Sequence, residues 1–310
     1  MHRIIALPII AAVIMGFMTA AGALAPIGVT YEDHGRAQVT EAATLTAPPG
    51  RDLVIASYTL APGTDSGWRD HGGPAVLAVT SGTLVIRSAS GCTTSEYTTG
   101  QAAVVPAGRH ILSNAGDQPL AFSGAFLDGA ADGITPFLDG GEAPAPTGCG
   151  GAAGNGLRTA SARVSPVRSS RGTFVGPDAY QHSAHGHHAG GIKVEAGKDI
   201  LVTSYHAEPY ATAGWMTHLP ALEIVTKGTA TYYEGHDGHC VKAGEFTAGQ
   251  AYVHTAPVTH MPVNETPAVV EVTVVYFNLP HNARPVPVVG NQTDAVNFAA
   301  LPPADCPRLR

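Results

Sequence analysis

The chain has 310 residues, with 17 basic and 24 acidic side chains that give a formal net charge of −7 at pH 7. This acidic balance argues against a surface that binds nucleic acid or anionic membranes, so we expect neither partner. Only 13% of the residues are charged, while 37 Gly and 24 Pro interrupt the chain at short intervals, which is typical of short strands joined by many turns.

The first 25 residues have the pattern of a secretory signal peptide. A short basic start precedes an apolar run that ends in Ala23-Leu24-Ala25, a small-x-small sequence of the kind that signal peptidase cleaves. A membrane anchor is the alternative, but Pro8 and Gly16 interrupt the run and no basic cluster follows it. We therefore expect residues 1–25 to be removed and the remaining chain to be secreted, extracellular or periplasmic, without a membrane association.

An internal repeat covers most of the remaining chain. The sequence DLVIASY at residues 52–58 is answered by DILVTSY at residues 199–205, a spacing of 147 residues. Matching residues continue in the same order in both halves: Trp68 and Trp215, His71 and His218, His110 and His260. The sequence therefore predicts a duplicated domain.

Each copy shows short strands without helical periodicity. In the first copy the predicted strands cover residues 52–59, 75–80, 83–87, 102–106, 110–114 and 119–126, and the second copy has counterparts. Their Val, Ile, Thr and Tyr content predicts an all-β fold, built as an antiparallel barrel or double sheet.

The segment between the copies, residues 127–180, is rich in Gly, Pro, Ala and Ser and has no sustained pattern. We therefore predict a first domain at 26–150, a linker at 151–180 and a second domain at 181–310.

Four cysteines in a chain expected to be exported favour two disulfides. Four thiols allow three pairings, and the repeat favours equivalent bonds in the two copies, Cys92–Cys149 and Cys240–Cys306. Metal binding by the thiolates is the alternative, but the chain has no Cys-x-x-Cys pair.

The second copy carries two spaced motifs. His218 is followed after four residues by Glu223, and a glycine is followed after ten residues by His260 and then, after three more, by Asn264. In these motifs the chain resembles the cupin superfamily, whose barrels hold a divalent metal with three His and one Glu. The resemblance implies two tandem cupin barrels of the jelly-roll type. It also implies metal ligands at His218, Glu223 and His260, with Met216 where the first His is expected.

The first copy departs further from these motifs. Arg69-Asp-His71 replaces His-x-His, Val76 or Leu77 takes the position of the Glu, and His110 comes one residue early. Two histidines without a carboxylate rarely hold a metal firmly. We expect the first barrel to be empty or to bind an organic ligand.

Two imidazoles and one carboxylate on neighbouring strands are the ligand set of non-haem iron centres. His218, Glu223 and His260 would supply it, although iron, manganese, zinc, nickel and copper all remain open because these ligands select weakly among them. Met216 shares a strand face with His218, where a thioether is a weak ligand or an apolar wall. The alternative is that the two histidines are buried, hydrogen-bonded remnants of a lost site.

Several other residues are candidates for ligand binding. A cluster at residues 182–188 holds His182, His185, His187 and His188, which would collect a metal or respond to mild acid, although a solvated loop is the simpler interpretation. Both tryptophans precede a site histidine and either stack on a ligand or pack in the core. The remaining candidates are Trp68, Arg69, His71 and His110 in the first barrel and Trp215, Met216 and His254 in the second.

Three functions are consistent with this sequence. The first is a secreted enzyme that uses a divalent metal in the second barrel, an oxygenase or decarboxylase of a small organic molecule. The second is a non-catalytic extracellular protein that binds a small molecule or a carbohydrate, and the third is a structural protein whose sites have decayed. The fold alone does not choose among them, and assembly into a homo-oligomer stays open.

Overall fold

The computed structural model describes residues 27–129, 144–149, 166–175, 191–236, 239–255 and 258–283. Within these residues every regular element is a strand, which confirms the all-β prediction. In this part of the chain no helix is long and apolar enough to cross a membrane. The predicted signal peptide, the histidines at 182–188 and Cys306 lie outside the described residues.

The strands of the first copy include all six that the sequence predicts, together with two short ones, β4 and β7. They are β3 (Asp52–Leu60), β4 (Arg69–His71), β5 (Ala75–Ser81), β6 (Thr83–Ser88), β7 (Thr94–Thr98), β8 (Gln101–Val105), β9 (Gly108–Asn114) and β10 (Leu120–Gly129). Four of the five side chains of β7 are exposed, so this strand lacks the apolar alternation that reveals a half-buried strand in a sequence.

The strands of the second copy repeat this order. They are β13 (Asp199–Thr212), β14 (Met216–His218), β15 (Ala221–Lys227), β16 (Thr229–His236), β17 (His239–Thr247), β18 (Gln250–His254), β19 (Val258–Val263) and β20 (Val270–Leu279). In the first copy the strand orders are β8-β5-β10-β3 and β4-β9-β6-β7, and the second copy pairs its equivalent strands in the same way. The duplication seen in the sequence is therefore also a duplication of topology.

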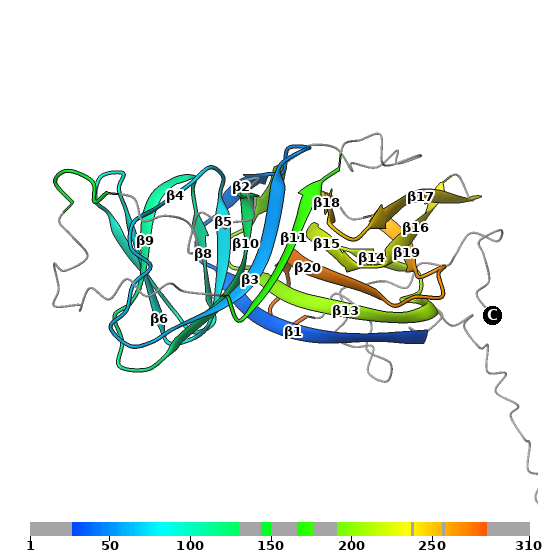
Figure 1. Ribbon diagram of the computed structural model, residues 1–310, viewed down its shortest axis with the longest axis horizontal. Coiled ribbons are helices and arrows are strands. Elements are labelled where there is room, and N and C mark those ends of the chain that lie inside the picture. Colours follow the sequence, from blue (N-terminus) through cyan, green and yellow to red (C-terminus); the bar gives the residue numbers. More distant parts are fainter. Residues whose placement is uncertain are drawn as a thin grey trace, which may run out of the picture.

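Two further strands are exchanged between the copies. The strand β1 (Ile27–Val39) precedes the first copy but pairs antiparallel with β13 of the second, from Ile27↔Thr212 to Gln38↔Asp199 (Figure 1). The strand β11 (Arg168–Phe174) precedes the second copy but pairs antiparallel with β3 of the first. Each also makes a short parallel pairing with its own copy, β1 with β8 and β11 with β18. The two large sheets are thereby closed into one ring of strands.

The strand β11 lies inside the segment predicted as a linker at 151–180, so this part of the prediction is wrong for residues 168–174. The sequence RSSRGTF is mostly polar because its side chains meet polar partners. Ser170 Oγ lies 2.9 Å from Thr273 Oγ1, and Arg171 forms an ion pair with Asp52. A side chain at Gly172 would place its Cβ 2.9 Å from Ile224 Cγ2, so the close packing of this strand requires glycine.

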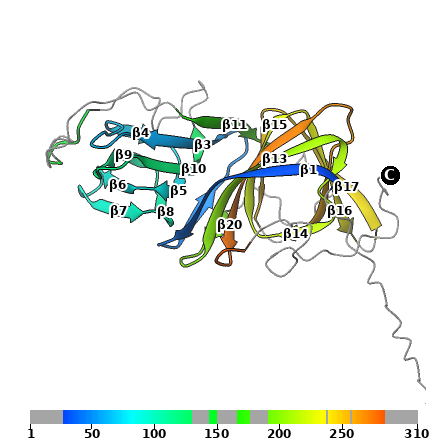
Figure 2. The ribbon, with the colours of Figure 1, turned by 90° about the horizontal axis from the view of Figure 1, so that it is seen from below.

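An apolar layer lies between the two large sheets. It includes Leu53 and Ile55 of the first copy and Leu222 and Ile224 of the second, all fully or almost fully buried. Two short strands pair with each other at the side of this layer, β2 (Ala43–Thr46) and β12 (Gly191–Val194). They occupy equivalent positions in the two copies. Figure 2 shows the two copies meeting along this junction, with β1 and β11 running across it.

The predicted disulfide Cys92–Cys149 is confirmed, with the two Cα atoms 5.2 Å apart. Trp68 is buried beside it, together with Ile111. In the second copy Trp215 is buried next to Cys240 in the same way. Both tryptophans thus pack in the core. Cys240 is also disulfide-bonded, and its pairing with Cys306 stays a prediction because the latter lies outside the described residues.

Candidate functional site in the second barrel

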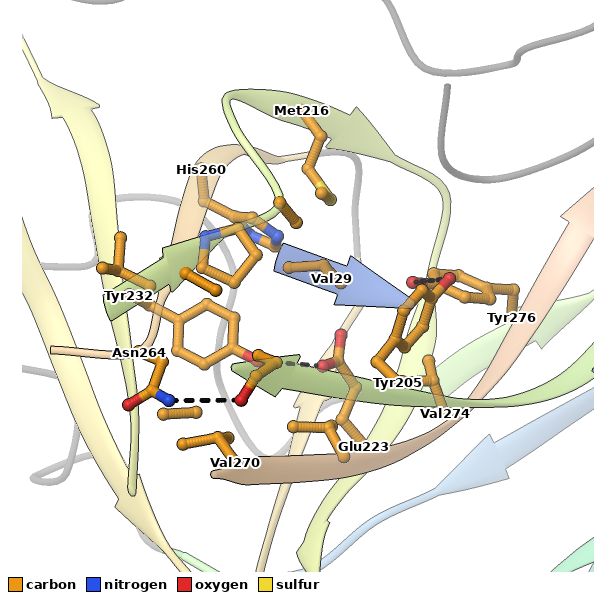
Figure 3. A pocket seen from close by; sticks show the side chains of 17 residues that line it. Val29, Tyr205, Met216, Glu223, Tyr232, His260, Asn264, Val270, Val274 and Tyr276 are labelled. Carbon is orange, nitrogen blue, oxygen red and sulfur yellow. Dashed lines mark hydrogen bonds between the residues drawn. The ribbon is translucent and has the colours of Figure 1, made fainter. Parts of the chain in front are cut away.

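The second barrel contains a cavity that opens to the surface. The side chains that line it are mainly aliphatic, and they include Val29 of the exchanged strand β1. The polar side chains stand together, with Glu223, Tyr232 and His260 reaching the cavity from three different strands (Figure 3). This arrangement suits a small organic molecule that has an apolar body and a polar end.

The carboxylate of Glu223 is the centre of the polar group. Glu223 lies in β15, is 4% exposed, and stands opposite Tyr252 of β18. Its Oε2 accepts hydrogen bonds from the hydroxyls of Tyr232, at 3.2 Å, and of Tyr252, while its Oε1 lies 3.2 Å from Nε2 of His254. A buried carboxylate is costly unless it is hydrogen-bonded, and here Oε2 accepts two hydrogen bonds while Oε1 lies beside the imidazole of His254.

Two buried histidines stand beside this carboxylate. The ring centroids of His254, in β18, and His260, in β19, are 4.9 Å apart, and the ring of Tyr232 lies edge-on to His260 at 5.4 Å. Met216 stands opposite His260 across the pairing of β14 with β19. The structure therefore brings together four predicted site residues, Met216, Glu223, His254 and His260.

The predicted metal set is only partly described. The backbone of His218 pairs with that of Val258, but the His218 side chain lies outside the described part of the structure. Among the described side chains, no group of three or more His, Cys, Asp or Glu residues is arranged to hold a metal ion. The three-ligand set with His218 therefore stays a prediction.

Four members of the polar group occur only in the second copy, whereas His260 has an equivalent in His110. Strand pairing places Glu223 opposite Tyr252 where the first copy places Leu77 opposite Ala103. Four polar residues of the second barrel thus replace apolar residues of the first: Glu223 for Leu77, Tyr232 for Ile86, Tyr252 for Ala103 and His254 for Val105. Because these replacements contact one another, they form one polar site.

The histidines of the first barrel form a different arrangement. His71 and His110 are both buried, and Nε2 of His71 lies 2.9 Å from Nδ1 of His110. The other ring nitrogen of His71 donates to the carbonyl of Gly73, which only accepts, so Nε2 of His71 is the acceptor from His110. Burial lowers the pKa of His71 to about 4 and also lowers the pKa of His110.

The neighbouring Arg69 is buried and donates from Nε to the carbonyl of Ser66, at 2.7 Å. With Leu77 in the position of Glu223, the described contacts of Arg69, His71 and His110 fit internal hydrogen bonding within the first barrel.

Sequence reasoning missed the tyrosines of the site. Tyr232 and Tyr252 support Glu223, and Tyr276 donates to Tyr205 at 3.3 Å on another wall of the cavity. Burial raises the pKa of both Tyr205 and Tyr276 well above the ordinary value, which keeps them neutral. The signal was present in the spacing of Tyr252 and His254, since residues two apart share a strand face.

No family model matches the sequence, and no curated protein matches it. Among solved structures, a mutant of Bacillus subtilis oxalate decarboxylase is 14% identical, with 81% of this chain and 79% of that chain covered and a TM-score of 0.34. The same Bacillus subtilis enzyme at pH 4.6 is 12% identical, with 80% and 77% covered and a TM-score of 0.33. Likeness of this size is loose and assigns no activity to this chain.

Proposed function

We propose that the second barrel binds a divalent transition metal next to its cavity and uses it to act on a small organic molecule. The observation that carries this proposal is the buried polar group of Glu223, Tyr232, Tyr252 and His254, which occupies positions that are apolar in the first barrel. A duplicated fold does not need these groups for stability, because the first copy fills the same positions with aliphatic side chains.

The donor chemistry of the site fits such a metal. Glu223 and His260 both line the cavity, and His218 would complete a set of two imidazoles and one carboxylate. His254 is within reach of Glu223 and is a further nitrogen donor. A metal held there would act as a Lewis acid or bind oxygen, so decarboxylation and oxygenation are the two reaction classes we propose. Iron, manganese, zinc, nickel and copper all suit these donors.

The chain's own residues would prepare this site in two ways. Tyr232 and Tyr252 fix the orientation of the Glu223 carboxylate through hydrogen bonds to one oxygen. The aliphatic walls of the cavity exclude water from an apolar substrate, which strengthens polar interactions at the end where Glu223 and His260 lie.

We also propose that the chain is an exported two-barrel cupin. The signal-peptide pattern and the disulfide Cys92–Cys149 support export, since disulfides persist in oxidising compartments. The motifs of the second copy and the repeated double-sheet topology support the family.

Metal analysis of the full chain, expressed into an oxidising compartment without a His tag, tests the metal proposal. We expect near-stoichiometric metal by mass spectrometry in the wild type and its loss in Glu223→Gln and His260→Ala. The matched control is His110→Ala, which removes the equivalent histidine of the first barrel and should keep the metal. A wild-type protein that takes up no metal after reconstitution would disprove the proposal.

The second candidate is a non-catalytic protein that binds a small molecule or a carbohydrate. The apolar lining of the cavity favours it, because such a lining binds a ligand without any metal. A ligand that raises the melting temperature equally before and after metal removal would support this function over the enzymatic one.

A further inference from the structure

Tyr210 has an unusual backbone conformation for its residue type. Its φ is +61°, in the left-handed region, where a side chain with a Cβ is disfavoured and glycine is the usual residue. The side chain is also 61% exposed, so burial does not compensate for this conformation. An exposed, bulky residue kept in a strained position points to a role outside folding.

The first copy contains the same loop with a different residue. Gly63 occupies the position equivalent to Tyr210, has a φ of +68°, and also follows a proline. In the first copy the side-chain amide of Asn114 donates to the carbonyl of Leu60, at 3.0 Å. In the second copy Asn264 donates likewise to Ala207, at 3.2 Å. The two loops thus share one construction, and only the second carries an aromatic side chain.

The loop with Tyr210, an interruption near the end of β13, lies beside the second-barrel cavity. Ala207 and Ala211, on either side of it, both line the cavity. The register between β1 and β13 shifts from Val29↔Ala207 to Ile27↔Thr212, so residues 208–211 of β13 have no partner residue in β1. Gly28 lies beneath this loop, where an added Cβ would lie 3.2 Å from the Cβ of Ala211.

We infer that Tyr210 contacts the ligand of this cavity by packing its ring on the ligand's apolar ring body. The polar end of that ligand reaches Glu223, Tyr232 and His260, which offer hydrogen-bond acceptors and donors to a hydroxyl group. The aliphatic walls lie between these two contacts. The ligand class is therefore a neutral ring compound with a hydroxyl group. This inference rests on the proposed use of the cavity for an organic molecule, but it does not require the metal.

Phenol, benzyl alcohol and cyclohexanol are the probes that test this inference, titrated calorimetrically into the full chain with and without bound metal. Tyr210→Gly, which installs the residue of the first copy, should weaken the binding of at least one aromatic probe by about 3- to 10-fold. Tyr210→Asn, which tolerates the left-handed conformation, should do the same. Neither variant should lower the melting temperature by more than about 2 °C, since strain is relieved.

The matched control is Gly63→Tyr in the first copy. It should leave probe binding unchanged and lower the melting temperature by about 2–4 °C, because the strain is introduced without a ligand contact. The inference is overturned if Tyr210→Gly and Tyr210→Asn bind the probes as the wild type does, if no probe binds the wild type, or if both variants lose stability strongly. Metal content separates the two proposals, since both Tyr210 variants should keep the wild-type value.

Discussion

The hydroxyl of Tyr252 donates a hydrogen bond to the buried carboxylate of Glu223, and the two residues stand opposite each other on β18 and β15. At the equivalent place in the first barrel, Ala103 stands opposite Leu77. The same pair of positions therefore holds a polar contact in the second barrel and an apolar contact in the first.

This relationship predicts the effect of Tyr252→Phe. Removing the hydroxyl leaves the Glu223 carboxylate with fewer donors, so we expect the free energy of unfolding to fall by about 1–3 kcal/mol in chemical denaturation. The same substitution should cost much less in a Glu223→Leu background, because no carboxylate then needs the donor. Equal losses in both backgrounds would show that the hydrogen bond contributes nothing.

The histidine pair of the first barrel predicts a pH dependence of stability. Burial lowers the pKa of His71 from 6.5 to about 4, so between these values the unfolded chain binds more protons than the folded one. The free energy of unfolding is therefore highest, as far as His71 is concerned, above pH 6.5. It decreases as the pH falls toward 4, by an amount on the order of 3 kcal/mol. Unfolding measured across this range should be less pH-dependent in His71→Gln; an unchanged slope would contradict the assignment.

The disulfide of the first copy predicts a large stability effect. Cys92 and Cys149 are 57 residues apart in sequence, and closing a loop of this length restricts the unfolded chain. We expect the double variant Cys92→Ser/Cys149→Ser to lose about 4 kcal/mol of unfolding free energy. The fluorescence of Trp68, which packs beside this bond, should report the change. A loss below about 1 kcal/mol would mean that the bond adds little.

The exchanged strands predict that the two copies need each other. We expect each copy to expose the apolar layer between the large sheets when it is expressed as a separate chain, residues 26–150 or 151–310. Each should aggregate alone, whereas the two should copurify when expressed together, because β1 pairs with β13 and β11 with β3. Two stable, independent monomers would contradict the importance of the exchange.

Much of this protein was readable from its sequence. The spacing of the repeat, the β-branched strands and the equivalent cysteines predicted the all-β fold, its duplication and the Cys92–Cys149 bond. Each of these depends on local residue pattern or on comparison of the two copies, which a sequence displays directly. The resemblance of the second copy's motifs to the cupin superfamily placed Glu223 and His260 among the site candidates.

Tertiary structure alone decided how these pieces meet. The polar strand β11 gave no apolar pattern, because its side chains pair with Asp52 and Thr273 from other strands. The contacts of Tyr232 and Tyr252 with Glu223 join three strands across the barrel interior. Hydrogen bonds and strand pairing between residues far apart in sequence depend on their positions in space, and local residue pattern does not specify those positions.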